Sequence, residues 1–187
     1  SSGMGILPYV NPREGEVKIS GIGLIKDFKL SGYLSEYDSS YFNELKGTRK
    51  TGSVFVNIDG IPVSYVIQGT KRSIKLINDD PDKLEIEIKV TNEGYVPSSE
   101  ADKEIFNSDF IKKAEKGLNK LEEKSCSLVI KKLQKDYNLD ALMMGDYLMK
   151  YHPDIWSKVK DKWNDVYPEI KITPVVDNKI RRIGSVK

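Results

Sequence analysis

The sequence predicts an α+β fold, in which an antiparallel β-sheet meander packs against one long α-helix and two shorter C-terminal helices, with a closing edge strand. Three observations support this fold class. Short runs over residues 53–90 alternate between apolar and polar residues and are separated by turn residues, as in a strand meander. Residues 109–137 place apolar residues three and four apart, as in an amphipathic helix. Shorter apolar repeats follow from residue 139 onward and precede a final apolar run.

The first 18 residues show no regular apolar period. Ser1–Met4 is typical of an expression scar, and Pro8 and Pro12 interrupt the residues that follow. We therefore expect a tag scar and linker over residues 1–18, with residues 4–18 as a linker or the tail of a preceding domain, and a single α+β domain over residues 19–187. One domain is the natural expectation for 187 residues, because domains commonly contain about 100–200.

A β-hairpin and a short helix are expected next. The hairpin covers residues 21–34, where small and apolar residues flank Lys26-Asp27 and alternate best on the second strand. Asp38-Ser39-Ser40 can cap a helix that runs to about Lys46 and is closed by Gly47.

Three strands of a meander follow the short helix. Ser53–Ile58 alternates, and the Asp59-Gly60 dipeptide after it predicts a tight hairpin turn. The second strand covers Val63–Gln68 and continues through Ser73–Ile77. Leu84–Val90 is the most regular strand, because its even-numbered residues are apolar and its odd-numbered residues are charged. We expect its even-numbered face to be buried and its odd-numbered face to be solvated.

A long helix is expected over residues 109–137, with Asn107 or Ser108 as its N-cap. At 1.5 Å per residue, such a helix would be about 40 Å long. Its apolar stripe would consist of Ile111, Ala114, Leu118, Leu121, Ser125 and Leu128. Lysine and glutamate fill most other positions, so we expect the remaining surface, including Glu122 and Glu123, to be solvated.

Two further helices and a strand complete the predicted fold. Leu139–Tyr151 forms the first helix, and Pro153 suits the first turn of the second. The buried face of the second helix would consist of Ile155, Trp156, Val159, Trp163 and Val166. The closing strand runs from Ile170 toward Arg182, and Pro174 favours an edge position because proline cannot donate to a sheet ladder.

The composition argues against several classes of protein. The formal net charge is only +2 and lysine greatly outnumbers arginine, so the basic footprint of a nucleic-acid binder is missing. A single cysteine, Cys126, excludes an internal disulfide and a cysteine-based zinc site. No apolar run approaches the roughly 18 residues that span a bilayer. We expect no nucleic-acid partner, no cofactor and a monomeric isolated domain.

No residue pattern predicts a catalytic, cofactor or metal site. His152 is the only histidine, and no neighbour in the sequence would orient it as a catalytic base. Asp79, Asp80 and Asp82 form the tightest acidic cluster, but this segment lacks the glycine and the final glutamate of an EF-hand loop. We therefore predict that the chain is not an enzyme. The alternative is a small ligand-binding or hydrolytic domain with an unrecognised carboxylate site.

A basic cluster crowds the expected edge strand at Lys179, Arg181 and Arg182. Strand alternation cannot bury all three side chains, and arginine is uncommon in this chain. We expect one arginine to pair with a carboxylate of a neighbouring strand or helix. The other would then be available to anionic lipid headgroups or to a partner subunit.

Several motifs occur in a defined order along residues 21–184. They are the hairpin over residues 21–34, the helix over Ser39–Lys46, the lysine-rich helix over residues 109–137, and the segments Asp140–Gly145, Tyr151–Trp156, Trp163–Pro168 and Lys179–Gly184. This ordered set resembles the C-terminal domain of the C subunits of bacterial spore germinant receptors, the Ger(x)C lipoprotein family.

The resemblance implies a function that the residues alone do not. It implies a non-catalytic domain of a receptor C subunit, which supports nutrient-triggered spore germination by assembling with the membrane A and B subunits. Members of the family are lipoproteins, so the resemblance also implies an N-terminal lipid anchor absent from this sequence and a place on the outer face of the spore inner membrane. The family defines no catalytic residues in this domain, and we carry none over.

Overall fold

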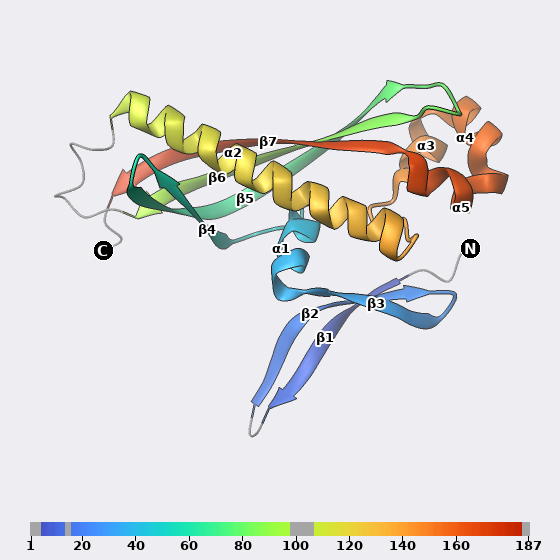
Figure 1. Ribbon diagram of the computed structural model, residues 1–187, viewed down its shortest axis with the longest axis horizontal. Coiled ribbons are helices and arrows are strands. Elements are labelled where there is room, and N and C mark those ends of the chain that lie inside the picture. The colour runs from blue at the N-terminus through green and yellow to red at the C-terminus, as the bar shows by residue number, and fades with distance from the viewer. Residues whose placement is uncertain (1–4, 14–15, 98–106, 185–187) are drawn as a thin grey trace.

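The computed structural model describes residues 5–13, 16–97 and 107–184 and confirms the predicted α+β fold class (Figure 1). The strands are β1 (Gly5–Arg13), β2 (Glu16–Lys26), β3 (Lys29–Ser35), β4 (Gly52–Ile58), β5 (Ile61–Asn78), β6 (Glu85–Pro97) and β7 (Lys171–Gly184). The α-helices are α1 (Glu36–Leu45), α2 (Ser108–Lys131), α3 (Met144–Tyr151), α4 (Pro153–Val159) and α5 (Trp163–Val166). A π-helical turn, η2 (Lys132–Asp136), continues α2, and the 3-10 turns η3 (Lys160–Lys162) and η4 (Tyr167–Glu169) flank α5.

The strands form two sheets. β1, β2 and β3 make an antiparallel sheet, and β4, β5, β6 and β7 make a second sheet in that order. β4, β5 and β6 are antiparallel, whereas β7 runs parallel to β6, so the sheet that we expected to be antiparallel is mixed. The chain leaves β6, runs back along the sheet through α2, and enters β7 at the end where β6 begins (Figure 1). The edge position predicted for Pro174 is confirmed, because β7 is the last strand of this sheet.

The N-terminal segment is a strand pair rather than a linker. β1 and β2 pair antiparallel, so the linker predicted over residues 4–18 is wrong where these strands lie. Pro8 and Pro12 suggested an interruption, but β1 is at the edge of its sheet, where a residue without an amide hydrogen is tolerated. The scar predicted for residues 1–4 lies outside the described residues.

The first hairpin and the first helix are present with shifted boundaries. The turn between β2 and β3 is Asp27-Phe28, whose φ angles are 50° and 63°, one residue later than expected. α1 starts after Ser35, whose Oγ accepts a hydrogen bond from the Asp38 amide at 3.1 Å. Asp38 is therefore not the N-cap, although its carboxylate accepts a hydrogen bond from Ser35 Oγ at 2.8 Å. Gly47 follows the helix with a φ of 69°, as its predicted role requires.

The central strands follow the prediction closely. Asp59-Gly60 joins β4 to β5 with φ angles of 53° and 85°, which are those of a tight hairpin turn. Ile86, Ile88 and Val90 in β6 are at most 1% exposed. The predicted register is therefore correct, since a slip of one residue would have placed the charged face in the core.

The long helix starts at the predicted N-cap, and its buried face includes Ala114, Leu118 and Ser125 of the predicted stripe. Asn107 Oδ1 accepts hydrogen bonds from the amides of the next turn, and the α-helix ends at Lys131. Its buried residues are Phe110, Ala114, Leu118, Glu122, Ser125, Cys126, Val129 and Ile130. Leu128 was expected in the stripe but is 51% exposed. The apolar pattern missed part of the buried face because Glu122, a glutamate, occupies its centre.

The helix predicted over Leu139–Tyr151 begins only at Met144. Asn138 and Met143 have positive φ angles, so the residues before Met144 do not continue a right-handed helix. Asp140 caps the N-terminus of α3, because its two carboxylate oxygens accept hydrogen bonds from the first amides of the helix.

The last predicted helix is divided into α4, η3 and α5. Trp156 and Trp163 were expected to be buried, but both are half-buried. Their rings meet edge to face at 5.2 Å, and both rings lie against Gly145. They pack on the edge of the main core instead of filling its centre.

Gly94 gives a test of the packing within the larger sheet. A Cβ at this position would lie 2.2 Å from the Val66 carbonyl oxygen and 2.8 Å from the Tyr65 ring. We predict that Gly94→Ala lowers the free energy of unfolding by about 1–3 kcal/mol, as overpacking does. Denaturant titration measures the change. Gly69→Ala is the matched control, because no atom would lie within 4 Å of its Cβ. Equal stability of the two variants would contradict this account.

Candidate functional site

Buried polar side chains meet where α1, α2, β6 and β7 pack together. They are Glu44 from α1, Arg49 from the loop after α1, Asn92 from β6, Glu122 from α2 and Asn178 from β7. Each of these five residues is at most 7% exposed. We call this group the buried charge network.

Hydrogen bonds connect all five members of the network. Arg49 Nη1 donates to Glu44 Oε2 at 2.6 Å and to Glu122 Oε1 at 3.4 Å. Asn92 Nδ2 lies 3.0 Å from Glu44 Oε1 and 3.1 Å from Asn178 Oδ1. Asn178 Nδ2 donates to Glu122 Oε2 at 2.5 Å. One guanidinium group therefore faces two carboxyl groups, and two asparagines supply further donors.

The two carboxyl groups of the network cannot both ionise at low cost opposite a single cation. Burial raises the pKa of Glu122 to about 8, and the negative charge of Glu44 adds to the shift. Burial also raises the pKa of Glu44. The pair therefore retains one proton at neutral pH.

The network is closed to solvent and is a structural element. Its carboxyl oxygens are bonded to protein groups, and Glu44 and Glu122 are both fully buried. The prediction that Glu122 belongs to a solvated helix face is wrong, because its side chain is buried and its carboxyl oxygens accept hydrogen bonds from Arg49 and Asn178 inside the protein. These acids converge, but a substrate has no access to them.

The raised pKa of Glu122 predicts that stability depends on pH. A carboxyl group that binds its proton more tightly in the folded state stabilises the fold most at low pH, and this contribution is lost as pH rises to about 8. Between pH 6.5 and 8, we expect the free energy of unfolding to fall by at most about 1.4 kcal/mol per pH unit. Glu122→Gln should flatten this slope in urea titrations.

Glu169→Gln is the control for this pH experiment, because Glu169 is exposed and pairs with Lys135 on the surface. It should keep the slope of the unsubstituted chain. If Glu122→Gln shows the same slope as the control, the proton is not held by the buried carboxyl pair.

The outer edge of β7 is covered by side chains of α2. Three α2 residues spaced four apart accept hydrogen bonds from β7 amides spaced two apart. The pairs are Glu123 with Val176 at 3.1 Å, Asn119 with Asn178 at 2.8 Å, and Glu115 with Ile180 at 2.9 Å. We call this row the α2–β7 ladder. It occupies donors that an edge strand would otherwise present to another chain.

The predicted basic cluster lies near the end of β7. Lys179 Nζ is 2.8 Å from Asp177 Oδ1, and Arg181 Nη2 is 2.8 Å from Glu93 Oε1 of β6. One arginine thus pairs with a neighbouring strand, as expected, although its side chain is 60% exposed. The side chain of Arg182 lies outside the described part of the structure. Exposed pairs of this kind contribute little to stability.

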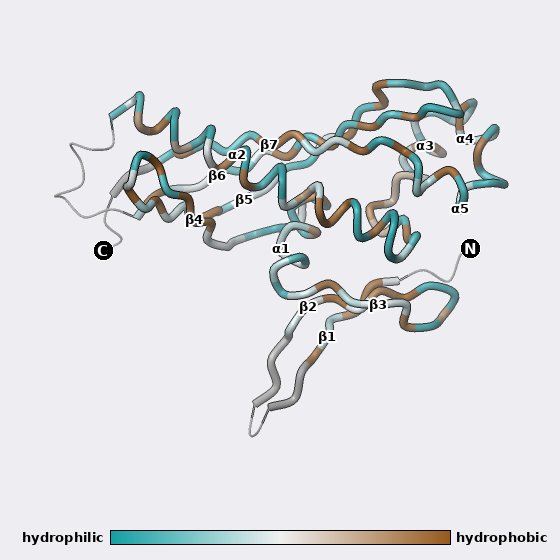
Figure 2. Tube along the Cα trace, viewed as in Figure 1, coloured by the Kyte–Doolittle hydropathy of each residue, from teal (hydrophilic) through white to brown (hydrophobic). Residues whose placement is uncertain are grey.

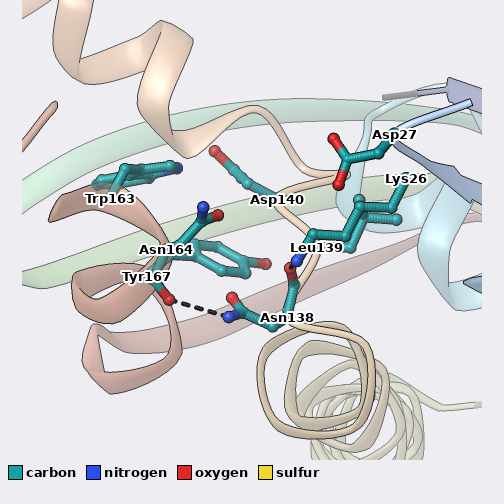
Figure 3. Close-up of a pocket in the computed structure, with 8 residues that line it drawn as sticks. All are labelled: Lys26, Asp27, Asn138, Leu139, Asp140, Trp163, Asn164 and Tyr167. Atoms are coloured by element: carbon teal, nitrogen blue, oxygen red, sulfur yellow. Dashed lines mark hydrogen bonds between the residues drawn. The ribbon is translucent and has the colours of Figure 1, made fainter. Parts of the chain in front are cut away.

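A pocket of about 120 Å³ lies between the N-terminal sheet and the C-terminal helices (Figure 3). Its lining residues are Lys26, Asp27, Asn138, Leu139, Asp140, Trp163, Asn164 and Tyr167. They come from the β2–β3 turn, the connection before α3, and the α5–η4 segment. We call it the hairpin pocket. None of its polar residues was predicted as a site, and Lys26 and Asp27 were expected only as a hairpin turn.

Asp140 is the buried acid of the hairpin pocket and is 7% exposed. It accepts hydrogen bonds from the amides of Met144 at 2.8 Å and Gly145 at 2.7 Å. Burial nevertheless raises the pKa of Asp140 to about 6. Its carboxylate caps α3 and carries negative charge into the pocket above that pH.

The N-terminal sheet has one apolar face that faces solvent. Leu7, Tyr9, Leu30 and Tyr33 are 38–65% exposed, and the rings of Tyr9 and Tyr33 stack at 5.3 Å. Strand alternation places Leu7, Tyr9 and Tyr33 opposite the face that buries Leu34, and the register shift at Leu24/Ile25 brings Leu30 to the same outer face. We call this surface the outer apolar face, and Figure 2 shows the hydrophobic segments of β1–β3 that contribute to it.

The other residues considered in the sequence have ordinary surroundings. His152 Nε2 lies 3.1 Å from Tyr147 Oη, and no acid orients it within the described residues. Cys126 is fully buried, and burial raises the pKa of its thiol. The Asp79–Asp82 segment is a turn in which Asp80 accepts the Asp82 amide.

The described ranges hold neither a metal-binding cluster nor a membrane-spanning helix. In residues 5–13, 16–97 and 107–184, no three His, Cys, Asp or Glu side chains gather where they could hold a metal ion. The helices in these same ranges are all too short or too polar to cross a membrane.

Comparison with known proteins gives matches over nearly the whole chain. The family described as "Spore germination B3/GerAC like, C-terminal" matches residues 20–184. Spore germination protein B3 of Bacillus subtilis (strain 168) is 27% identical over 184 residues, which cover 97% of this chain and 49% of that protein. Spore germination protein KC of the same strain is 29% identical over 166 residues, covering 84% of this chain and 40% of that protein.

The fold also matches a solved structure. The crystal structure of the GerBC protein superposes with a TM-score of 0.86 at 26% identity, over 97% of this chain and 57% of that chain. This chain spans about half the length of the curated relatives that it matches.

Proposed function

This chain belongs to the spore germination B3/GerAC-like family, whose C-terminal domain its residues 20–184 match, and from this we propose that it is a non-catalytic part of a germinant receptor C subunit. In that role it assembles with the membrane A and B subunits and supports nutrient-triggered germination. An N-terminal lipid anchor holds the full-length protein on the outer face of the spore inner membrane. The family match over most of the chain carries the proposal.

The distribution of polar groups favours an interaction domain over an enzyme. The acids that converge most closely are sealed in the buried charge network. Asp140, the buried acid of the hairpin pocket, uses both of its oxygens to cap α3. A hydrolytic carboxylate pair needs acids that reach a substrate and whose pKa values differ. The hydrolytic alternative is therefore the weaker reading.

The outer apolar face is the surface best suited to assembly. Leu7, Leu30 and Tyr33 are each more than half exposed. Contiguous exposed apolar side chains of this kind commonly mark protein interfaces. We propose that a membrane subunit of the receptor covers this face.

Leu30→Asp tests the proposed assembly surface. In spores that carry the full-length C subunit, we expect this change to reduce co-purification of the A and B subunits at least tenfold and to slow nutrient-triggered germination, because a charge would be buried in the interface. Phe55→Asp is the matched control, since Phe55 is 71% exposed on β4. Thermal unfolding of the purified full-length variant should match that of the unsubstituted protein.

A different outcome would give the outer apolar face another role. If Leu30→Asp lowers the melting temperature of the purified full-length protein, the face is covered by another part of the same polypeptide. If assembly and stability are both unchanged, this face does not contribute to the receptor complex.

The basic cluster is proposed as a second, weaker contact surface. Arg181→Glu reverses an exposed charge, and we expect it to weaken binding to vesicles that contain anionic lipid or to reduce receptor assembly. Lys113→Glu is the control, because Lys113 forms a similarly exposed pair with Asp59 elsewhere on the surface. Unchanged vesicle binding, assembly and germination rate would show that Lys179, Arg181 and Arg182 are only a solvated strand end.

A further inference from the structure

We propose that the hairpin pocket binds a small organic cation that carries a primary ammonium group. The proposal is separate from the assembly surface described above. It rests on unpartnered buried atoms, the negative formal charge of the lining, and the size and aromatic walls of the pocket (Figure 3).

Two buried atoms of the pocket have no hydrogen-bond partner among the described residues. They are Tyr167 Oη and Asn138 Oδ1, and Tyr167 is only 1% exposed. Asn138 is held in place because its Nδ2 donates to the Asn164 carbonyl oxygen at 2.9 Å. Buried polar atoms are rarely left unpaired, and each one requires an explanation. A bound molecule that donates to Asn138 Oδ1 and bonds to Tyr167 Oη would satisfy both.

The charges of the pocket select the kind of molecule that fits. Asp140 and Asp27 bring two carboxylates, whereas Lys26 brings one ammonium group. Lys26 Nζ already donates to the Asn138 main-chain oxygen at 2.8 Å. The formal charge of the lining is therefore −1. A positively charged donor is favoured, and an anion is disfavoured.

The size and walls of the pocket suit a compact amine. A volume of about 120 Å³ is well above the roughly 10–15 Å³ that a single water needs. The rings of Trp163 and Tyr167 lie 5.8 Å apart, and aromatic faces attract ammonium groups. Water alone could bond to the unpartnered atoms, but it would leave the negative charge of the lining uncompensated.

Three probes of similar size and different charge test the proposal on the 187-residue chain. Ethanolammonium, ethylene glycol and glycolate share a hydroxyl group but are cationic, neutral and anionic. In ¹⁵N-edited NMR titrations, we expect only ethanolammonium to give saturable shifts, and these should appear in all three segments that line the pocket. Tyr167→Phe should raise its Kd about tenfold or more, because a hydrogen bond in a charged site is lost. Tyr151→Phe, which removes an exposed hydroxyl outside the pocket, should bind normally.

Several results would overturn the proposal. They are the absence of saturable binding, equal responses to the three probes, or an unchanged Kd in Tyr167→Phe. If Tyr167→Phe does not fold, Asp27→Asn decides the question, because Asp27 is exposed at the β2–β3 turn and its loss should weaken binding several-fold without unfolding the chain. These measurements use the isolated chain, so their outcome is independent of receptor assembly in spores.

Discussion

The bonds between Arg49 and the carboxyl groups of Glu44 and Glu122 are the interaction on which the packing depends. They join α1 to α2, and Asn92 and Asn178 extend the contact to β6 and to the edge strand β7 of the mixed sheet. Replacing such a network with apolar residues can be neutral, but removing one partner leaves a buried charge and costs about 3–5 kcal/mol. The network thus specifies one arrangement of four elements. A purely apolar contact would tolerate more sliding between them.

This constraint separates the stable body of the molecule from its exposed surfaces. The sheet formed by β4–β7 is fixed by α2 and by the buried charge network. The N-terminal sheet contacts that body through one face and leaves the other apolar and exposed. The hairpin pocket lies where the two parts meet, with Lys26 on one side and Tyr167 on the other. A partner on the exposed face and a molecule in the pocket would both act on the same junction.

The sequence predicted the elements in which apolar and polar residues alternate in step with buried and exposed positions. Ile86, Ile88 and Val90 alternate with charged residues, so strand and register were both readable. The buried charge network could not be predicted in this way. In the sequence, Glu122 lies among lysines and glutamates of a charged helix, and only the fold brings Arg49 into contact with it. One signal was present in the sequence: two residues after Val90, the next position on the buried face of β6 is Asn92, a polar residue. A polar residue at a buried position predicts a partner without identifying it. The pocket depends on three distant segments and has no local signature.

The α2–β7 ladder relates the lengths of two segments that lie far apart in the chain. Four residues of helix rise about 6.0 Å and two residues of strand about 6.6 Å, so acceptors and amides stay aligned for only a few repeats. A single-residue insertion between Glu115 and Glu123 would rotate the following acceptors by about 100° away from β7. An insertion or deletion there preserves the ladder only if four residues change in α2 and two residues change in β7 at the same time. Gaps in this stretch of an alignment should therefore occur together or not at all.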